Sequence, residues 1–149
     1  LGELGVNDLV EVLGWNTIRD RDKPTVIYRG SRIPTSESIM YCLAFEKATD
    51  TKAIFHGHDR IVSRAVEAGL LSYPMTQEWH PYGTVGLAQE VAKIINLSDY
   101  LLIRDHHGAR WHGILSKGRT MKDAGERALN IHNLAGKLLR ENKVKDKKI

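Results

Sequence analysis

The chain has 149 residues, enough for one domain with a buried core, and no internal repeat or linker divides it. Its content of 42% hydrophobic and 27% charged residues excludes a disordered chain, and no apolar run approaches the roughly 20 residues of a membrane-spanning helix. The net charge of +4 and pI near 9.2 raise the question of nucleic-acid binding. We do not expect it, because no stripe of arginine and aromatic residues accompanies the charge; attraction of an anionic substrate is another explanation.

Apolar periodicity and turn residues predict the secondary structure. In chain order we expect strands at 8–13 and 25–29, a helix at 38–48, a strand at 52–56, helices at 60–71 and 87–95, strands at 100–104 and 110–115, and a helix from 120 to 140. Thr120 and Asp123 resemble a capping box for the last helix. Interleaved strands and helices, with some strands joined as hairpins, favour a layered α/β domain with a mixed or mainly antiparallel sheet. We expect one domain over 1–141 and a basic tail over 142–149.

The single cysteine, Cys42, excludes an internal disulfide and a zinc site built from several cysteines. It lies within the apolar pattern of the helix at 38–48, so we expect a buried thiol. One cysteine and the lack of an apolar leader are consistent with a reducing compartment, and a cytoplasmic location is the expectation.

His56 and His58 end an apolar strand in the sequence "AIFHGH". Side chains two residues apart on a strand project from the same face, so both imidazoles can converge on one metal ion. Gly57 between them lets another group approach the backbone closely. The alternative is a pair of hydrogen-bonded histidines at a strand end, and the motif alone leaves both interpretations open.

A third metal ligand is needed, because a catalytic zinc usually takes three protein ligands and keeps one position open. His106 and His107 follow another apolar strand and are expected at the same edge of the sheet. Adjacent histidines at a strand end point in opposite directions, so only one of them should bind the ion. His80 lies in a loop and is a candidate for lining a cleft. His112 is a weaker candidate, and His132 is expected to have a packing or surface role.

Thr35, Ser36 and Glu37 immediately precede the helix at 38–48. They can cap the helix, with the hydroxyls accepting backbone N–H bonds and Glu37 facing the positive end of the dipole. The same geometry can bind a phosphate, with Glu37 as a group that transfers protons. Spacing alone favours capping.

Taken in order, several segments resemble the class II aldolase/adducin family. They are "IPTSES", "AIFHGH", "HPYGTVGLAQEVA", "YLLIRDHHG" and the long helix "TMKDAGERALNIHNLA". The spacing from Glu37 to His56 also matches, and the resemblance covers most of the chain. It implies a three-layer α/β/α fold with a mainly antiparallel central sheet. It also implies an aldolase-type lyase that cleaves a small phosphorylated sugar or related hydroxy-carbonyl compound through a metal-stabilised enediolate.

The resemblance further implies the roles of individual residues. The implied ligands of a divalent metal, expected to be zinc, are His56, His58 and His107. Glu37 is implied to be the catalytic acid/base, and Thr35 and Ser36 to hold the substrate phosphate. A homotetramer with active sites between subunits is also implied.

Two features depart from the family pattern. The usual upstream Gly-Asn-Ile-Ser-like segment is missing, so we expect either that it lies before Leu1 or that this is a short variant with a different substrate. No tyrosine follows Tyr100 in the sequence. The resemblance implies one, because aldolases of this family use a tyrosine of the C-terminal tail near the active site of a neighbouring subunit. Two alternatives therefore stay open: a sugar-phosphate dehydratase of the methylthioribulose-phosphate type, and a non-catalytic adducin-like oligomerisation module.

Overall fold

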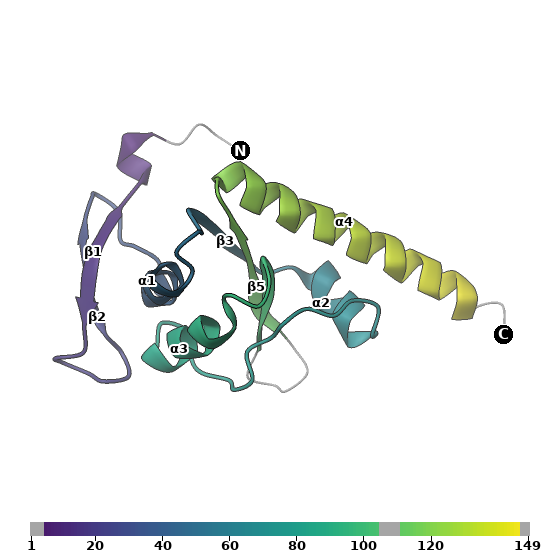
Figure 1. Ribbon diagram of the computed structural model, residues 1–149, viewed down its shortest axis with the longest axis horizontal. Helices are drawn as coiled ribbons and strands as arrows, with labels where there is room; N and C mark the ends of the chain where they lie inside the picture. Colours follow the sequence, from purple (N-terminus) through teal and green to yellow (C-terminus); the bar gives the residue numbers. More distant parts are fainter. Residues whose placement is uncertain (1–4, 105–110, 147–149) are drawn as a thin grey trace.

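The computed structural model describes residues 5–104 and 111–146, which form a central sheet between two helical layers (Figure 1). After a 3₁₀ turn at Val6–Asp8, the elements are β1 (Glu11–Asn16), β2 (Thr25–Arg29), α1 (Ser38–Lys47), β3 (Ala53–Gly57), α2 (Arg60–Glu67), α3 (Val85–Ile94), β4 (Tyr100–Arg104), β5 (Trp111–Gly118) and α4 (Met121–Asp146). In Figure 1, α1 and α3 lie on one side of β5, and α2 and α4 lie on the other. The prediction of a three-layer α/β/α fold is confirmed.

The central sheet has the strand order β3-β5-β4, and both strand pairs are antiparallel. β4 is buried on both faces, and its side chains alternate between them as the pleat requires. Leu101 and Ile103 pack with α1 and α3, whereas Tyr100 and Leu102 pack with α2 and α4. This explains why the strand is an unbroken apolar run.

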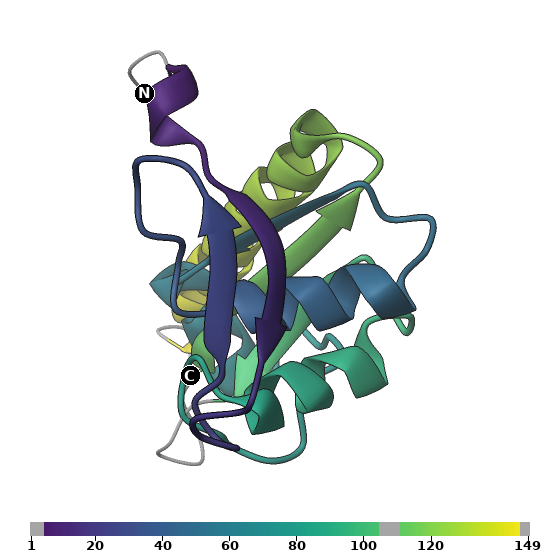
Figure 2. The same ribbon diagram turned by 90° about the vertical axis from the view of Figure 1, so that its left-hand side faces the viewer.

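The first two strands form a separate antiparallel hairpin. The hairpin lies on the outer side of α1 and α3, and it faces the viewer in Figure 2. Trp15 and Val26 pack against the core cluster of α1 and α3. Leu13, Ile27 and Tyr28 are exposed on the hairpin. The strand predicted at 8–13 is shifted toward the C-terminus: the 3₁₀ turn includes Asp8, and β1 runs from Glu11 to Asn16.

Two helices end at positions other than those predicted. α2 ends at Glu67 because Gly69 adopts a φ of 69°, a left-handed conformation that stops a helix. Ala68 is consequently exposed, and Val62 and Ala65 form the buried face of α2. α4 continues beyond the predicted end at 140 to Asp146, and the extension includes the good helix formers Glu141, Lys143 and Lys145 and no Gly or Pro.

The predicted capping box at the start of α4 is confirmed. The Thr120 N–H donates to Asp123 Oδ2 at 3.0 Å, and the Asp123 N–H donates to Thr120 Oγ1 at 3.1 Å. Of the helices in the described ranges, α4 included, none is long and apolar enough to cross a membrane.

The expectation of a fully buried Cys42 is wrong. α1 turns Ile39, Met40 and Ala44 toward the core, which leaves Cys42 on the flank of the helix and half-buried. Burial and the nearby carboxylate of Glu46 raise the pKa of the Cys42 thiol.

Candidate active site

Glu37 and His56 are brought into contact, although they come from different segments of the chain. Glu37 is the N-cap residue of α1, and His56 lies near the end of β3. The Glu37 Oε2 atom is 2.8 Å from His56 Nε2, and these side chains are only 8% and 9% exposed. The Glu37 carboxylate makes no capping hydrogen bond, so it faces His56 rather than the end of the helix.

The other ring nitrogen of His56, Nδ1, has a hydrogen-bond partner that limits the protonation states of the ring. His56 Nδ1 is 2.8 Å from the backbone carbonyl oxygen of Ile114. A carbonyl oxygen only accepts, so Nδ1 carries a proton. Nε2 then either carries a second proton and donates it to Glu37, or presents a lone pair toward the carboxylate. A lone pair and a carboxylate oxygen repel each other at 2.8 Å unless a proton or a metal cation lies between them. Metal-binding histidines commonly donate their other N–H to a backbone carbonyl, so the hydrogen bond to Ile114 suits His56 to the role of a metal ligand, with Glu37 beside it.

Gly113 in β5 makes room for the His56 ring. A Cβ at Gly113 would lie 2.5 Å from His56 Cε1 and 2.9 Å from the carbonyl oxygen of Gly57. No side chain fits there unless the imidazole moves. Gly113 therefore permits the position that the His56 ring occupies. Sequence reasoning missed this residue, because its role follows from the pairing of β3 with β5.

His58 lies beside His56, just after β3. The centroids of the two rings are 5.3 Å apart, and the ring planes meet at 70°. His58 is exposed and lines a cavity of about 590 Å³ between β3, α2 and α4. A metal-binding role for His58 thus remains a prediction. The other predicted ligand, His107, lies outside the described residues, as do His106 and the side chain of His112.

His132 lines the same cavity and bonds to Asp59, a contact that is consistent with the expected packing or surface role. His132 Nδ1 is 2.8 Å from Asp59 Oδ2. Asp59 Oδ1 accepts from the N–H groups of Ile61 and Val62, so the carboxylate caps α2 while it holds a histidine of α4. No local pattern could reveal this pair, since 73 residues separate its members.

The loop before α1 presents two exposed hydroxyl residues next to the buried Glu37. Thr35 Oγ1 accepts a long hydrogen bond of 3.4 Å from the Glu37 N–H, and Ser38 Oγ donates to the Thr35 carbonyl at 2.6 Å. These bonds stabilise the loop, but α1 has no side-chain cap, because its N-cap residue Glu37 makes no capping hydrogen bond. The exposure of Thr35 and Ser36 also leaves both accessible to a ligand, and their phosphate-binding role stays a prediction.

The "HPYGT" segment packs against this loop. Gly83 has a φ of 73°, and a Cβ there would lie 2.9 Å from the carbonyl oxygen of Ser36, so only glycine suits the position. Thr84 caps α3: its hydroxyl accepts from the Leu87 N–H at 3.3 Å and donates to the Pro81 carbonyl at 2.7 Å. The segment thus supports the loop that carries Ser36.

A second possible metal cluster is formed by Glu78, His80 and Glu90, whose ligand atoms lie within 4.8 Å of one another. The buried Glu90 carboxylate is already engaged. It accepts from the N–H groups of Gln77 and Glu78 at 3.0 and 2.9 Å, and from the Lys93 ammonium. Burial alone would raise the pKa of Glu90, but these hydrogen bonds lower it below its ordinary value. Glu90 therefore stabilises the loop that contains Gln77 and Glu78. The region around Glu37 and His56 is the stronger candidate for the active site.

Tyr41 is a further residue of this region that sequence reasoning missed. It lies four positions after Glu37 on α1, the spacing that puts two side chains on one helix face. Burial, and then the charge of Glu37, raise the pKa of Tyr41 to about 12. Its phenol therefore stays protonated at neutral pH and offers an O–H donor near Glu37.

Comparison with known proteins gives matches at the level of structure only. No family model matches the chain, and no curated protein does. The chain is similar to an L-fuculose 1-phosphate aldolase, with 21% sequence identity and a TM-score of 0.57 over 82% of this chain and 58% of that one. It is also similar to a sugar-phosphate aldolase from Thermotoga maritima, with 21% identity and a TM-score of 0.61 over 82% of this chain and 60% of that one. The chain thus spans about 60% of the length of either structure, and over that length it has a class II aldolase-like fold.

Proposed function

We propose that this chain acts in a metal-dependent lyase of the aldolase type, whose substrate is a small phosphorylated sugar or related hydroxy-carbonyl compound. The observation that carries the proposal is the buried 2.8 Å contact between Glu37 Oε2 and His56 Nε2. The Ile114 carbonyl orients the His56 ring through its other nitrogen, as is common for metal-binding histidines, and this supports His56 as a ligand. The class II aldolase-like fold supports the same assignment.

The metal is proposed to be zinc, with His56, His58 and His107 as its ligands. When bound, a divalent metal would polarise the substrate carbonyl and stabilise the negative charge that develops there. Nitrogen ligands suit zinc, and three of them leave a position for the substrate.

Glu37 is proposed to be the acid/base. In an aldol cleavage the substrate hydroxyl loses its proton as an aldehyde forms, and the carbon–carbon bond breaks. The electron pair of that bond stays on the carbon next to the carbonyl, and this carbon must then receive a proton. A carboxyl group held at the site and shielded from water suits this transfer, and Glu37 is 8% exposed.

Thr35 and Ser36 are proposed to hold the substrate phosphate. They are exposed, they precede the N-terminus of α1, and they adjoin Glu37 in the sequence. A helix N-terminus attracts anions through its backbone N–H groups and its dipole. A phosphate held there would place the sugar carbons near Glu37. The proposed assembly is a homotetramer, which sedimentation velocity would test.

A cleavage assay tests the proposal. Purified wild-type chain is incubated with zinc and a panel of ketose 1-phosphates, and the products are identified by NMR. We expect an aldehyde and a ketone phosphate, loss of turnover in His56→Ala, and unchanged turnover in the matched variant His80→Ala. Loss of water without carbon–carbon cleavage would support the dehydratase instead. Absence of turnover together with absence of bound metal would contradict any enzymatic role and favour an adducin-like module.

A further inference from the structure

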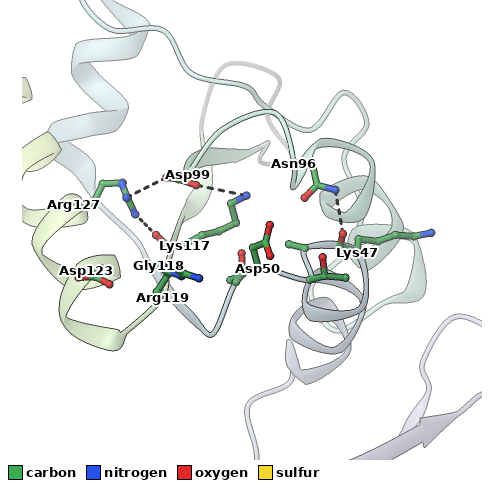
Figure 3. A pocket seen from close by; sticks show the side chains of 12 residues that line it. Lys47, Asp50, Asn96, Asp99, Lys117, Gly118, Arg119, Asp123 and Arg127 are labelled. Carbon is green, nitrogen blue, oxygen red and sulfur yellow. Dashed lines mark hydrogen bonds and ion pairs between the residues drawn. The ribbon is translucent and has the colours of Figure 1, made fainter.

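Figure 3 shows a polar cavity of about 670 Å³ that is lined by residues including Asp50, Asp99 and Lys117. It lies at the opposite end of the central sheet from Glu37 and His56. Its walls come from the segment after α1, the turn between α3 and β4, and the connection between β5 and α4. At this end Gly118 pairs with Ala53, whereas His56 pairs with Leu115. Three strand residues correspond to about 10 Å along the sheet. The cavity is therefore separate from the proposed active site.

Lys117 is a buried cation in the lining of this cavity. Its side chain is 8% exposed, and its ammonium donates a hydrogen bond to the Ile95 carbonyl. The nearest carboxylate oxygen of Asp99 is 3.8 Å away, too far for a hydrogen bond. An ammonium has three N–H donors, and among the described residues only the Ile95 carbonyl accepts one of them. Oxygen atoms of a ligand in the cavity would accept hydrogen bonds from the other two N–H groups. Such bonds are strongly favourable, because burying a charge without partners is costly.

Further cations surround Lys117. Arg127 Nη2 is 3.1 Å from Asp99 Oδ2, and the guanidinium also donates to the Lys117 carbonyl (Figure 3). Asp99 is therefore shared between two cations. Arg119 is exposed and lines the same cavity, while the carboxylate of Asp123 is engaged in the cap of α4. This wall consequently carries an excess of positive charge that attracts an anion.

Another part of the cavity lining is acidic and carries hydroxyl groups. Asp50 lines the cavity, and its sequence neighbours Thr49 and Thr51 add hydroxyl groups. A carboxylate accepts hydrogen bonds from hydroxyl groups and repels a second anion. The lining thus suits a molecule with a single anionic group and several hydroxyls.

We propose that this cavity binds the phosphate monoester of a small polyhydroxylated molecule, such as a sugar monophosphate. The phosphate contacts Lys117, Arg119 and Arg127, and hydroxyl groups of the same molecule contact Asp50. The volume of about 670 Å³ lies within the range of small-molecule pockets. Binding at this site requires neither Glu37 nor a metal.

Isothermal titration calorimetry with ribose 5-phosphate tests the proposal, with ribose and inorganic phosphate as comparison probes. The double variant Glu37→Gln/His56→Ala removes the proposed active site, so binding by this variant reports on the cavity alone. We expect it to bind ribose 5-phosphate more tightly than either comparison probe. Adding Arg119→Gln or Lys117→Met to it should weaken binding about tenfold or more, the usual value of a hydrogen bond to a charged group. Lys122→Gln makes the same charge change on an exposed residue outside the lining and should have no effect.

Three outcomes would overturn the proposal. They are absence of binding in the double variant, unchanged affinity in Arg119→Gln, and equal weakening by Lys122→Gln. Arg119 is exposed, so its replacement keeps the fold even if Lys117→Met does not. Because the calorimetry measures binding in a variant without the proposed active site, failure of the lyase proposal would leave this result unaffected.

Discussion

The two ends of the central sheet differ in the charge that they bury. At one end the Glu37 carboxylate lies 2.8 Å from His56 Nε2, a contact that a proton or a metal cation between the two atoms stabilises. At the other end the Lys117 ammonium is buried with one bonded carbonyl acceptor and a shared carboxylate. Burying a polar or charged group is costly unless a partner satisfies it. The two ends therefore call for opposite ligands, a cation near His56 and an anion near Lys117.

The largest effect is expected from Glu37→Gln. Loss of the acid/base should lower kcat about a hundredfold to ten-thousandfold, the typical contribution of a general acid or base. The amide cannot transfer the proton, while the histidines still bind metal. The turnover number and the metal content of both proteins check this. Undiminished turnover would remove Glu37 from the chemistry.

Gly113→Ala tests the site without changing a proposed ligand. The added Cβ would lie 2.5 Å from His56 Cε1 and must displace the ring. We expect metal affinity to fall about tenfold to a hundredfold, as for other changes in the support of a ligand. Competition with a chelator measures it. Gly125→Ala is the matched control, since its Cβ meets nothing within 4 Å. Equal affinities of the two variants would show that the position of the His56 ring is irrelevant.

Lys117→Met tests whether the buried lysine at the other end of the sheet contributes to stability. Replacing a buried charge by an apolar side chain of similar length is often neutral or stabilising, so the free energy of unfolding should fall by less than about 1 kcal/mol, if at all. Asp99→Asn should lower it by about 1 kcal/mol, since Lys117 and Arg127 then lose their shared carboxylate. Urea denaturation provides both values. A loss above about 3 kcal/mol in Lys117→Met would mean that the lysine serves the fold rather than a ligand.

Tyr41→Phe should have the smallest effect, confined to alkaline pH. The tyrosine pKa of 10.0 in the unfolded chain rises to about 12 in the folded protein, through burial and the charge of Glu37. The neutral phenol is thus favoured by folding, so its contribution is complete below pH 10 and is lost as the pH rises toward 12. The free energy of unfolding should therefore fall less steeply between pH 10 and pH 12 in the variant than in the wild type. Identical declines would contradict the raised pKa.

Much of the fold could be predicted because its signals are local. The continuous apolar run of β4 and the capping box at Thr120 and Asp123 each depend on residues close in sequence. The end of α2 was misplaced because it depends on the left-handed conformation of Gly69. Likewise, periodicity alone could not tell which flank of α1 meets the core, and Cys42 was misjudged for that reason.

The candidate site was predictable only in part. Glu37 and His56 are proposed from motifs, and their contact shows that the two segments meet. The hydrogen bonds that position the histidines were not predictable, because they join residues that are distant in sequence. The Ile114 carbonyl bonds to His56 across the sheet, and Asp59 bonds to His132 between two helices. Such contacts depend on strand register and helix packing, which no single segment encodes.

Metal analysis of purified protein tests the central claim most directly. Wild-type chain and His56→Ala are incubated with zinc, passed through a desalting column and measured by inductively coupled plasma mass spectrometry, with His80→Ala as the control for the Glu78–His80–Glu90 cluster. We expect about one zinc per chain in the wild type and in His80→Ala, and none retained in His56→Ala. Zinc that persists in His56→Ala but disappears in His80→Ala would place the metal in the other cluster and contradict this claim.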